Sequence, residues 1–334
     1  MKLFDAHSDI WSDVTVRRLR GERHVLRERH LERLRAGGVE GGIFVIWVDP
    51  PFDADPAART EQIMEAVRAE LAEERGVRLV RSWAELEAAR TEGTFYILLG
   101  IEGLAAVGED VERIDWYYAC GARHAGLTWN EENALATGVK GDPDRGLTAA
   151  GRAAVRKIQE KGMLLDVSHL NERSFWDAAD AAVGPVIASH SNCRALCDVP
   201  RNLTDEQLRA VRDLGGVVGL NAFRLFVDPD PRRQDLVHLL RHAGHMIDVM
   251  GVDHVGCGFD FCEMAASAAV ILSEFLEADT MASMTEGDAV LRGLEDCARL
   301  PALLEGLRDM GLTAEEAEKI AFGNFHRLLR QVLG

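Results

Sequence analysis

Six side chains that can bind a cation or carry a proton stand at the ends of short apolar runs. They lie in the segments DAHSD, GIEG, DVSH, ASH and GCGFD and are His7, Asp9, Glu102, His169, His190 and Asp260. Near-continuous apolar runs of this kind are typical of buried parallel strands. In a barrel of parallel strands the carboxyl ends meet at one rim, where active sites lie. We therefore expect these groups, which come from five strand ends, to converge.

The first pair has the spacing of a metal site. Side chains alternate faces along a strand, so His7 and Asp9 point to the same side. An imidazole nitrogen and a carboxylate oxygen can bind one cation at about 2.0–2.2 Å. Glu102 ends an apolar strand, and it needs a cation or a hydrogen-bond network there because burying an unpaired charge is costly. Each motif by itself also fits an ordinary structural residue, whereas the whole set favours a metal site.

Strands and helices alternate along the chain. We predict eight strands, at Leu3–Asp9, Gly42–Val48, Phe95–Glu102, His124–Trp129, Met163–His169, Val186–His190, Val217–Asn221 and His254–Asp260. Between them we predict helices at Ala58–Arg75, Val111–Cys120, Thr148–Lys161, Glu172–Ala182, Thr204–Leu214 and Leu236–Met250. Two further helices, Leu300–Met310 and Ala314–Leu333, follow the last strand. This order predicts one α/β domain over residues 1–334, a (β/α)₈ TIM-like barrel with additional C-terminal helices. Val77–Val80 is a candidate for a further short strand, and a doubly wound sheet is the alternative fold.

Composition restricts the partners of the protein. The 334 residues include 38 Lys and Arg against 55 Asp and Glu, which gives a net charge of −17. This acidic excess argues against nucleic acid or an anionic membrane as a partner, because both attract basic surfaces. The six cysteines form no CxxC pair, and no apolar stretch of about 20 residues occurs. We therefore expect a cytoplasmic protein with reduced thiols.

Three other features have alternative interpretations. We interpret the Arg-rich stretch Thr15–Ala36 as a salt-bridged surface helix rather than a nucleic-acid-binding arm. The segment Glu263–Leu291 fits either a lid over the active site or a contact in a homo-oligomer. His238, His242 and His245 share one face of a predicted outer helix, and we expect a structural role for them rather than metal binding.

In their order and spacing, the motifs resemble the renal (membrane) dipeptidase family, metallopeptidase family M19. The resemblance covers nearly the whole chain and includes HSD, GIEG, DVSH, ASHS, the Arg-Asn pair at positions 201 and 202, and VGCGFD. It implies an amidohydrolase-type barrel with two zinc ions. It also implies hydrolysis of dipeptides, often with a D-residue at the C-terminal position.

The resemblance further implies roles for individual residues. It assigns His7 and Asp9 to one zinc ion, His169 and His190 to the second, and Glu102, with a water or hydroxide, to the bridge between them. Imidazole and carboxylate ligands suit Zn²⁺, and two metals can polarise the scissile carbonyl. Asp260 matches the acid and base that moves a proton from the attacking water to the leaving amine. Arg201 matches the arginine that holds the free carboxylate of the substrate.

The chain departs from the family at one position. Where the family often has a histidine that contacts the substrate carbonyl, this sequence has Trp129. We interpret Trp129 as an apolar wall beside the substrate, with the indole N–H as its one donor. Asn130 is adjacent and is a further candidate substrate contact if a turn begins there. His124 lies an odd number of residues before Trp129 and is therefore predicted to face the outer helices.

The sequence thus predicts a zinc-dependent dipeptidase. Two alternatives stay open: hydrolysis of another small carboxylate-bearing amide, such as an N-acyl amino acid, and a metal-bound binding protein without catalytic activity. Asp260 argues against the second alternative, because a binding protein has no use for a positioned proton carrier.

Overall fold

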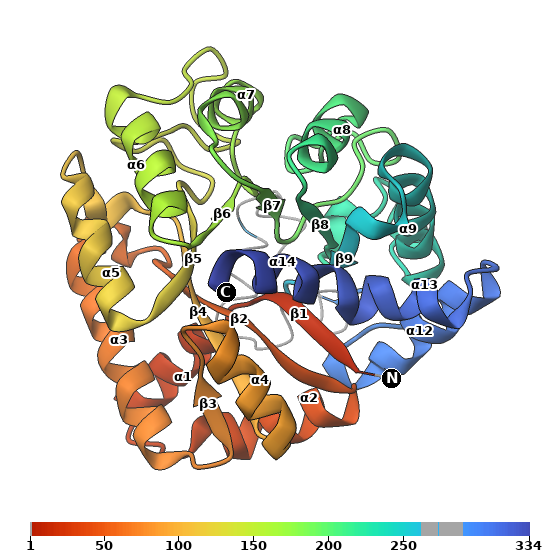
Figure 1. The fold of residues 1–334 in the computed structure, drawn as a ribbon, viewed down its shortest axis with the longest axis horizontal. Helices are drawn as coiled ribbons and strands as arrows, with labels where there is room; N and C mark the ends of the chain where they lie inside the picture. The colour runs from red at the N-terminus through yellow and green to blue at the C-terminus, as the bar shows by residue number, and fades with distance from the viewer. Residues whose placement is uncertain (1, 262–272, 274–289) are drawn as a thin grey trace.

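A ring of parallel strands forms the centre of the protein (Figure 1). The computed structural model describes residues 2–261, 273 and 290–334. In barrel order the strands are β1 (Leu3–Ser8), β2 (Val39–Trp47), β4 (Phe95–Glu102), β5 (Ala122–Gly126), β6 (Leu164–Asp166), β7 (Val186–Ala188), β8 (Val217–Leu220) and β9 (Val255–Cys257). Neighbours in this order pair in parallel, and the amide of Asp260 donates to the carbonyl of His7 to bring the last strand beside the first. The predicted barrel class is confirmed.

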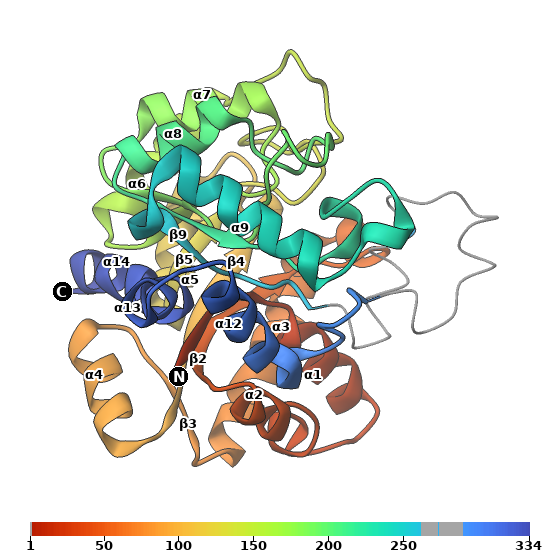
Figure 2. The same ribbon diagram turned by 90° about the vertical axis from the view of Figure 1, so that its right-hand side faces the viewer.

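Helices cover the outside and the amino-terminal end of this ring (Figures 1 and 2). They are α1 (Ile10–Leu19), α2 (Glu32–Ala36), α3 (Pro56–Glu73), α4 (Trp83–Glu92), α5 (Ile114–Cys120), α6 (Ala149–Glu160), α7 (Glu172–Ala181), α8 (Asp205–Asp213), α9 (Leu236–Met250), α12 (Leu300–Asp309), α13 (Ala314–Glu318) and α14 (Asn324–Leu333). Local sequence determines where several of these helices begin. The side chains of Asn171, Thr204 and Asp235 each accept an amide N–H three residues on, which satisfies a donor left unpaired at the helix start. None of the described helices has the length and apolar character needed to cross a membrane.

The strands end earlier than predicted. β6, β7 and β9 have three residues each, so His169, His190 and Asp260 lie in the loops that follow them. Two of these residues have backbone conformations that are uncommon without glycine, with φ of +69° at His169 and +54° at Asp260. The backbone therefore leaves the hydrogen-bonded sheet and turns at the barrel mouth, at the positions of these predicted site residues.

The candidate further strand is confirmed as β3 (Val77–Leu79), which pairs with β4 off the barrel path. The Arg-rich stretch forms α1, a π-helical turn over Leu26–Leu31 and α2. Its arginines make ion pairs, as Arg17 does with Asp13 at 2.8 Å, so the expected salt bridges are present, although the stretch forms separate helical segments rather than one helix. Nearly all of the segment 263–291 lies outside the described residues, as does Cys262, the fifth of the six cysteines.

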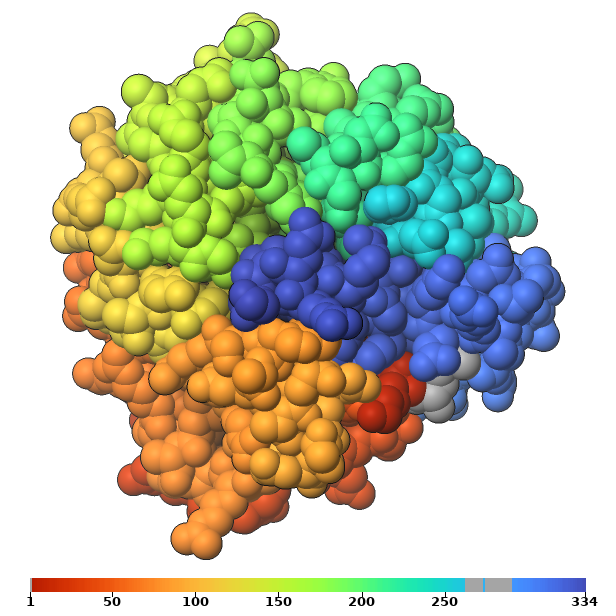
Figure 3. Space-filling view, viewed as in Figure 1, coloured from red at the N-terminus to blue at the C-terminus, as the bar shows by residue number. Residues whose placement is uncertain are grey.

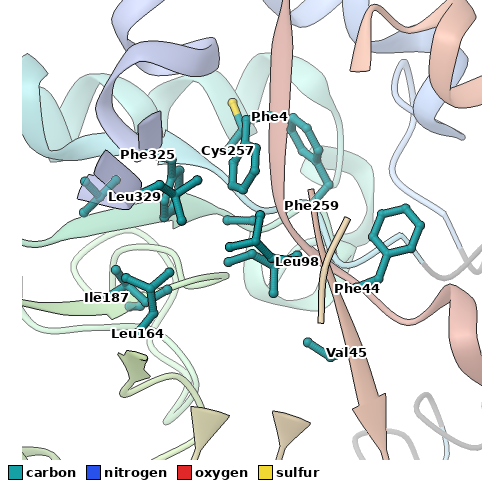
Figure 4. Close-up of a cluster of buried hydrophobic side chains, with 14 of the residues drawn as sticks. Phe4, Phe44, Val45, Leu98, Leu164, Ile187, Cys257, Phe259, Phe325 and Leu329 are labelled. Carbon is teal, nitrogen blue, oxygen red and sulfur yellow. The ribbon is translucent and has the colours of Figure 1, made fainter. Parts of the chain in front are cut away.

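Helix α14 closes the amino-terminal end of the barrel (Figures 1 and 3). The ring of Phe4 in β1 lies 5.7 Å from that of Phe325 and 6.2 Å from that of Tyr96, measured between centroids. The Tyr96 hydroxyl is 2.7 Å from His326 Nε2, and Figure 4 shows Phe325 and Leu329 among buried strand side chains. Because this end is filled by packed side chains, the site must open at the opposite, carboxyl end.

Asn324 ties α14 to the start of β9 and generates a test of the fold. Its buried side-chain amide donates to the carbonyls of Val252 and Val255, both at 2.7 Å. Asn324→Ala leaves two carbonyls without this donor and should lower the free energy of unfolding by about 1–3 kcal/mol, as measured in urea. The control Arg327→Ala removes an exposed donor from the same helix and should leave the free energy of unfolding nearly unchanged. Equal effects of the two variants would contradict this role.

Candidate metal centre and active-site pocket

The carboxylate of Glu102, the last residue of β4, lies among three histidines. Its Oε1 atom is 2.8 Å from Nε2 of His169 and 3.6 Å from Nε2 of both His7 and His190. Nε2 of His7 is also 3.7 Å from Oδ2 of Asp9. The structure therefore brings these five predicted ligands together at the carboxyl end of the barrel.

The predicted groups form two clusters, each able to hold an ion, and a third possible set consists of His7, Asp166 and His190. In one, His7, Asp9 and Asp260 each offer a ligand atom, and these atoms lie within 4.8 Å of one another. In the other, Glu102, His169 and His190 do the same. Asp260 is further anchored by Asn221, whose side-chain amide donates to its Oδ2 at 3.2 Å. Imidazole nitrogens with carboxylate oxygens are a donor set suited to zinc and similar divalent ions.

Polar atoms in this centre lack ordinary partners. His7 Nε2 and Asp9 Oδ1 are buried without a hydrogen-bond partner among the described residues. The Nε2 atoms of His169 and His190 face each other at 2.9 Å. An imidazole nitrogen without a proton and a carboxylate oxygen are both acceptors, so two such atoms can approach this closely only around a proton or a cation. The residues present therefore fit a bound metal.

Burial makes charge unfavourable in the centre and shifts its pKa values. Loss of hydration raises the pKa of Glu102 to about 8 and that of Asp260 to about 6, and the Asp9 charge adds to both shifts. Burial opposes protonation of His7, but the nearby Glu102 and Asp9 carboxylates outweigh it and raise its pKa well above the usual range. Burial lowers the pKa of His169 far below its usual range. These carboxylates thus lie where a positive ion would stabilise them.

Asn130 holds one of the histidines. Strand β5 ends at Gly126, and the chain then turns so that Asn130 is buried. Its Oδ1 atom accepts a hydrogen bond from Nδ1 of His169 at 2.9 Å. This bond places the ring proton on Nδ1 and leaves the Nε2 lone pair toward Glu102. Asn130 lines the pocket described next, and its buried Nδ2 atom has no hydrogen-bond partner in the described part of the chain.

A pocket of about 470 Å³ opens beside Glu102. The indoles of Trp47 and Trp129 form part of its wall, with ring centroids 5.0 Å apart. Trp129 also lies 6.2 Å from the His169 ring, so the structure places this predicted substrate contact beside the metal centre. The prediction omitted Trp47, although the sequence held a signal, because Trp47 ends an apolar run as Glu102 does. The structure pairs these two residues in register.

The predicted orientation of His124 is wrong. This residue faces the barrel interior, where its Nε2 atom is 2.9 Å from Oδ2 of Asp166. Counting odd and even positions fails because β5 ends at Gly126, so alternation along the strand says nothing about Trp129. Burial raises the pKa of Asp166, but hydrogen bonds from His124 and Ser189 outweigh it and hold the pKa below the usual range.

Arg201 lies on the other side of the barrel mouth, in the loop after β7. It is 2% exposed, and its guanidinium donates to the Ser191 hydroxyl and to the His190 carbonyl, each at 3.2 Å. Its Nε atom has no hydrogen-bond partner among the residues that the structure describes. In the strand order, β7 is four places from β2, so Arg201 and the Trp47 wall lie across the centre from each other.

The three histidines of α9 have separate partners. His238 contacts Asp235 at 2.7 Å, and His245 contacts Asp205 at 2.7 Å. His242 contacts the Val227 carbonyl and the Cys193 amide. Within the described ranges these histidines do not form a metal cluster, in keeping with the structural role expected for them.

Comparisons with known proteins relate this site to a family. A family model described as membrane dipeptidase (peptidase family M19) matches residues 1–275. The chain is 36% identical over 265 residues to an uncharacterized protein encoded in the pqqA 5′ region of Klebsiella pneumoniae, covering 77% of this chain and 89% of that protein. It is similar to the crystal structure of an M19 metallopeptidase described as dipeptidase AC (29% identity, TM-score 0.84, 100% of this chain and 99% of that one). It is also similar to a Rhodobacter sphaeroides metallopeptidase bound to a phosphinate mimic of L-Ala-D-Ala (28% identity, TM-score 0.83, 99% of each chain).

Proposed function

Because the chain belongs to the membrane dipeptidase family, peptidase family M19, and is a hydrolase of the metallo-dipeptidase class, we propose that it is a two-zinc dipeptidase. Its substrates are dipeptides with a free carboxylate, including those with a D-residue at the C-terminal position. The observation that carries this proposal is the meeting of two histidine and carboxylate clusters at Glu102, opposite the buried Arg201. The dipeptide mimic bound to the Rhodobacter sphaeroides neighbour supports the substrate class.

The two clusters and the position of Glu102 support an assignment of the metal ligands. His7 and Asp9 would hold one zinc ion, His169 and His190 would hold the other, and Glu102, which lies 3.6 Å from Nε2 of both His7 and His190, would serve both. When bound, two zinc ions of this kind lower the pKa of a water molecule and polarise a carbonyl. Asn130 supports this arrangement, because its contact with His169 presents Nε2 to the centre.

Asp260 is placed to move the proton that peptide hydrolysis requires. It is buried next to His7 and Asp9, and the amide of Asn221 holds one of its oxygens. From this position its carboxylate takes a proton from the attacking water and gives it to the leaving amine.

Two opposite features orient the substrate. Arg201 binds the free carboxylate with a planar fork of donors. A dipeptide held in this way, with its scissile bond at Glu102, extends its amino-terminal residue toward Trp47 and Trp129. The indole wall then selects among the side chains of that residue. The same apolar wall also fits an acyl chain, so hydrolysis of N-acyl amino acids is the second candidate.

Turnover assays test the substrate class. The wild type should hydrolyse L,L- and L,D-dipeptides faster than N-acyl amino acids of matched size. Arg201→Ala removes a buried charge-assisted contact, which typically costs about 2–5 kcal/mol, so kcat/KM on free dipeptides should fall at least tenfold. Dipeptides capped as C-terminal amides are the control, and kcat/KM on them should fall little in this variant. Equal losses on free and capped substrates would give Arg201 a structural role, and a preference for acyl amino acids would replace the dipeptidase assignment.

Elemental analysis tests the shared metal ligand. Protein purified without chelator should contain close to two zinc equivalents per chain. Glu102→Gln should weaken both sites together, because one carboxylate oxygen lies near histidines of both clusters. The matched control Glu132→Gln changes an exposed carboxylate at the pocket rim and should retain both ions. Loss of a single ion from Glu102→Gln would rule out the bridge.

Replacement of Asp260 tests proton transfer. Asp260→Asn keeps the shape of the side chain and removes the base, so kcat should fall by roughly 10²–10⁴ while zinc content stays at the wild-type level. Steady-state kinetics with metal analysis of the same sample measures both effects. Full activity would refute the role in proton transfer, and loss of zinc would make Asp260 a metal ligand instead.

A further inference from the structure

Behind the metal-facing histidines lies a buried network that the proposed reaction does not use. It consists of His124, Asp166 and Ser189, which are at most 3% exposed. His124 lies in β5, Asp166 ends β6 and Ser189 follows β7, so three neighbouring strands bring these polar groups together inside the barrel. Burying polar groups costs free energy of folding unless they are hydrogen-bonded. In this network the donor and the acceptor of each hydrogen bond can be identified.

Asp166 accepts hydrogen bonds on both carboxylate oxygens. Its Oδ1 accepts the backbone amides of Ser168 at 2.9 Å and Ser189 at 3.0 Å. Its Oδ2 accepts from His124 Nε2 at 2.9 Å and from the Ser189 hydroxyl. An ionised carboxylate has no proton to donate. The hydroxyl proton of Ser189 is therefore committed to Asp166.

Because the Ser189 proton is used in this bond, the Ser189 oxygen can only accept hydrogen bonds from its other neighbours. Nδ1 of His190 is 2.7 Å from this oxygen, and Nδ1 of His7 is 3.4 Å from it. The two rings lie side by side, with centroids 3.6 Å apart. A hydroxyl oxygen has two lone pairs, so it can accept one N–H from each ring. Both rings then carry their proton on Nδ1.

The opposite nitrogen of each ring faces the proposed metal centre. Nε2 of His7 and Nε2 of His190 are each 3.6 Å from Oε1 of Glu102. A proton on Nδ1 leaves a lone pair on Nε2, which is the form of neutral imidazole that binds a metal through that atom. Asp166 accepts from Ser189, and Ser189 accepts from both rings. This order of donors and acceptors thus decides whether these two histidines can act as ligands.

We propose that Ser189, supported by Asp166, is a positioning residue that holds His7 and His190 in the metal-binding tautomer. This inference rests on the proposed metal centre and adds a second link between its two clusters, since one hydroxyl serves a histidine of each. His169 is independent of this link, because Asn130 holds its Nδ1 atom. Removing such an outer partner typically weakens metal binding 10–100-fold.

Calorimetric titration of chelator-stripped protein with Zn²⁺ tests the shared role. Ser189→Ala should raise the dissociation constants of both zinc ions, one of them by roughly 10–100-fold. The larger shift belongs to the ion on His190, whose contact with the hydroxyl is shorter. The control Ser168→Ala removes another buried hydroxyl, which accepts the His190 backbone amide rather than a ring N–H, and should change either constant less than about threefold. Unchanged constants in Ser189→Ala, or a change in one constant only, would overturn the proposal.

Asp166→Asn reverses the direction of the network. Two backbone amides face the Oδ1 position, so the carbonyl of the new side chain must stay there and its NH₂ group must face Ser189. Ser189 then accepts this N–H and turns its own proton toward His190, which moves the ring proton to Nε2. Zinc affinity should therefore fall at least as far as in Ser189→Ala, and the double variant should be no weaker than Asp166→Asn. Additive losses would show that the two residues act separately.

A spectroscopic measurement on the wild-type protein tests the tautomers directly and does not depend on the folding of a variant. In zinc-loaded protein with ¹⁵N-labelled histidine, NMR should show protonated Nδ1 and metal-bound Nε2 in both His7 and His190. A proton on Nε2, or metal on Nδ1, in either ring would overturn the proposal even if dipeptides are hydrolysed. Conversely, absence of dipeptide turnover with the expected tautomers would refute the proposed function and leave the role of Ser189 intact.

Discussion

The need to stabilise the buried Glu102 carboxylate is the constraint on which the functional end of this protein depends. Glu102 lies among three histidine nitrogens, and Asp9 and Asp260 add further negative charge nearby. Such a concentration of acceptors is stable only around cations. The parallel barrel makes the arrangement possible, because its strands end at one rim while α14 fills the other end with packed side chains. Stability and chemistry are thus separated along the barrel axis.

The three histidines around Glu102 are contacted on the side of each ring that faces Glu102 and also on the opposite side, at Nδ1. Asn130 fixes His169, and Ser189 contacts both His7 and His190. Each of these contacts is made on Nδ1, so all three rings direct Nε2 to the same point. The acceptor oxygens of Asn130 and Ser189 therefore set the orientation of the rings in this centre.

The mouth of the barrel is polar on one side and aromatic on the other. Arg201 lies in the loop after β7, and the Trp47 and Trp129 wall lies beside β2 and β5. In the proposed reaction, this asymmetry gives an extended dipeptide one preferred direction across the metal centre. In the proposed reaction, Trp129 stands where the family resemblance implies a histidine, so carbonyl polarisation is assigned mainly to the metals and the indole contributes shape and an apolar surface.

Apolar runs followed by His7, Glu102 or His190 were enough to predict a barrel with a polar centre, because side-chain periodicity and the common rim of parallel strands are local rules. The sequence could not show where each ladder stops. Asn130 reaches His169, and the Ser189 oxygen contacts two rings, through loops that follow different strands. His124 lies within β5 and faces Asp166 of β6, a direction that counting from Trp129 could not give. Alternation no longer sets side-chain direction once the backbone leaves the sheet, so only the tertiary structure decided them.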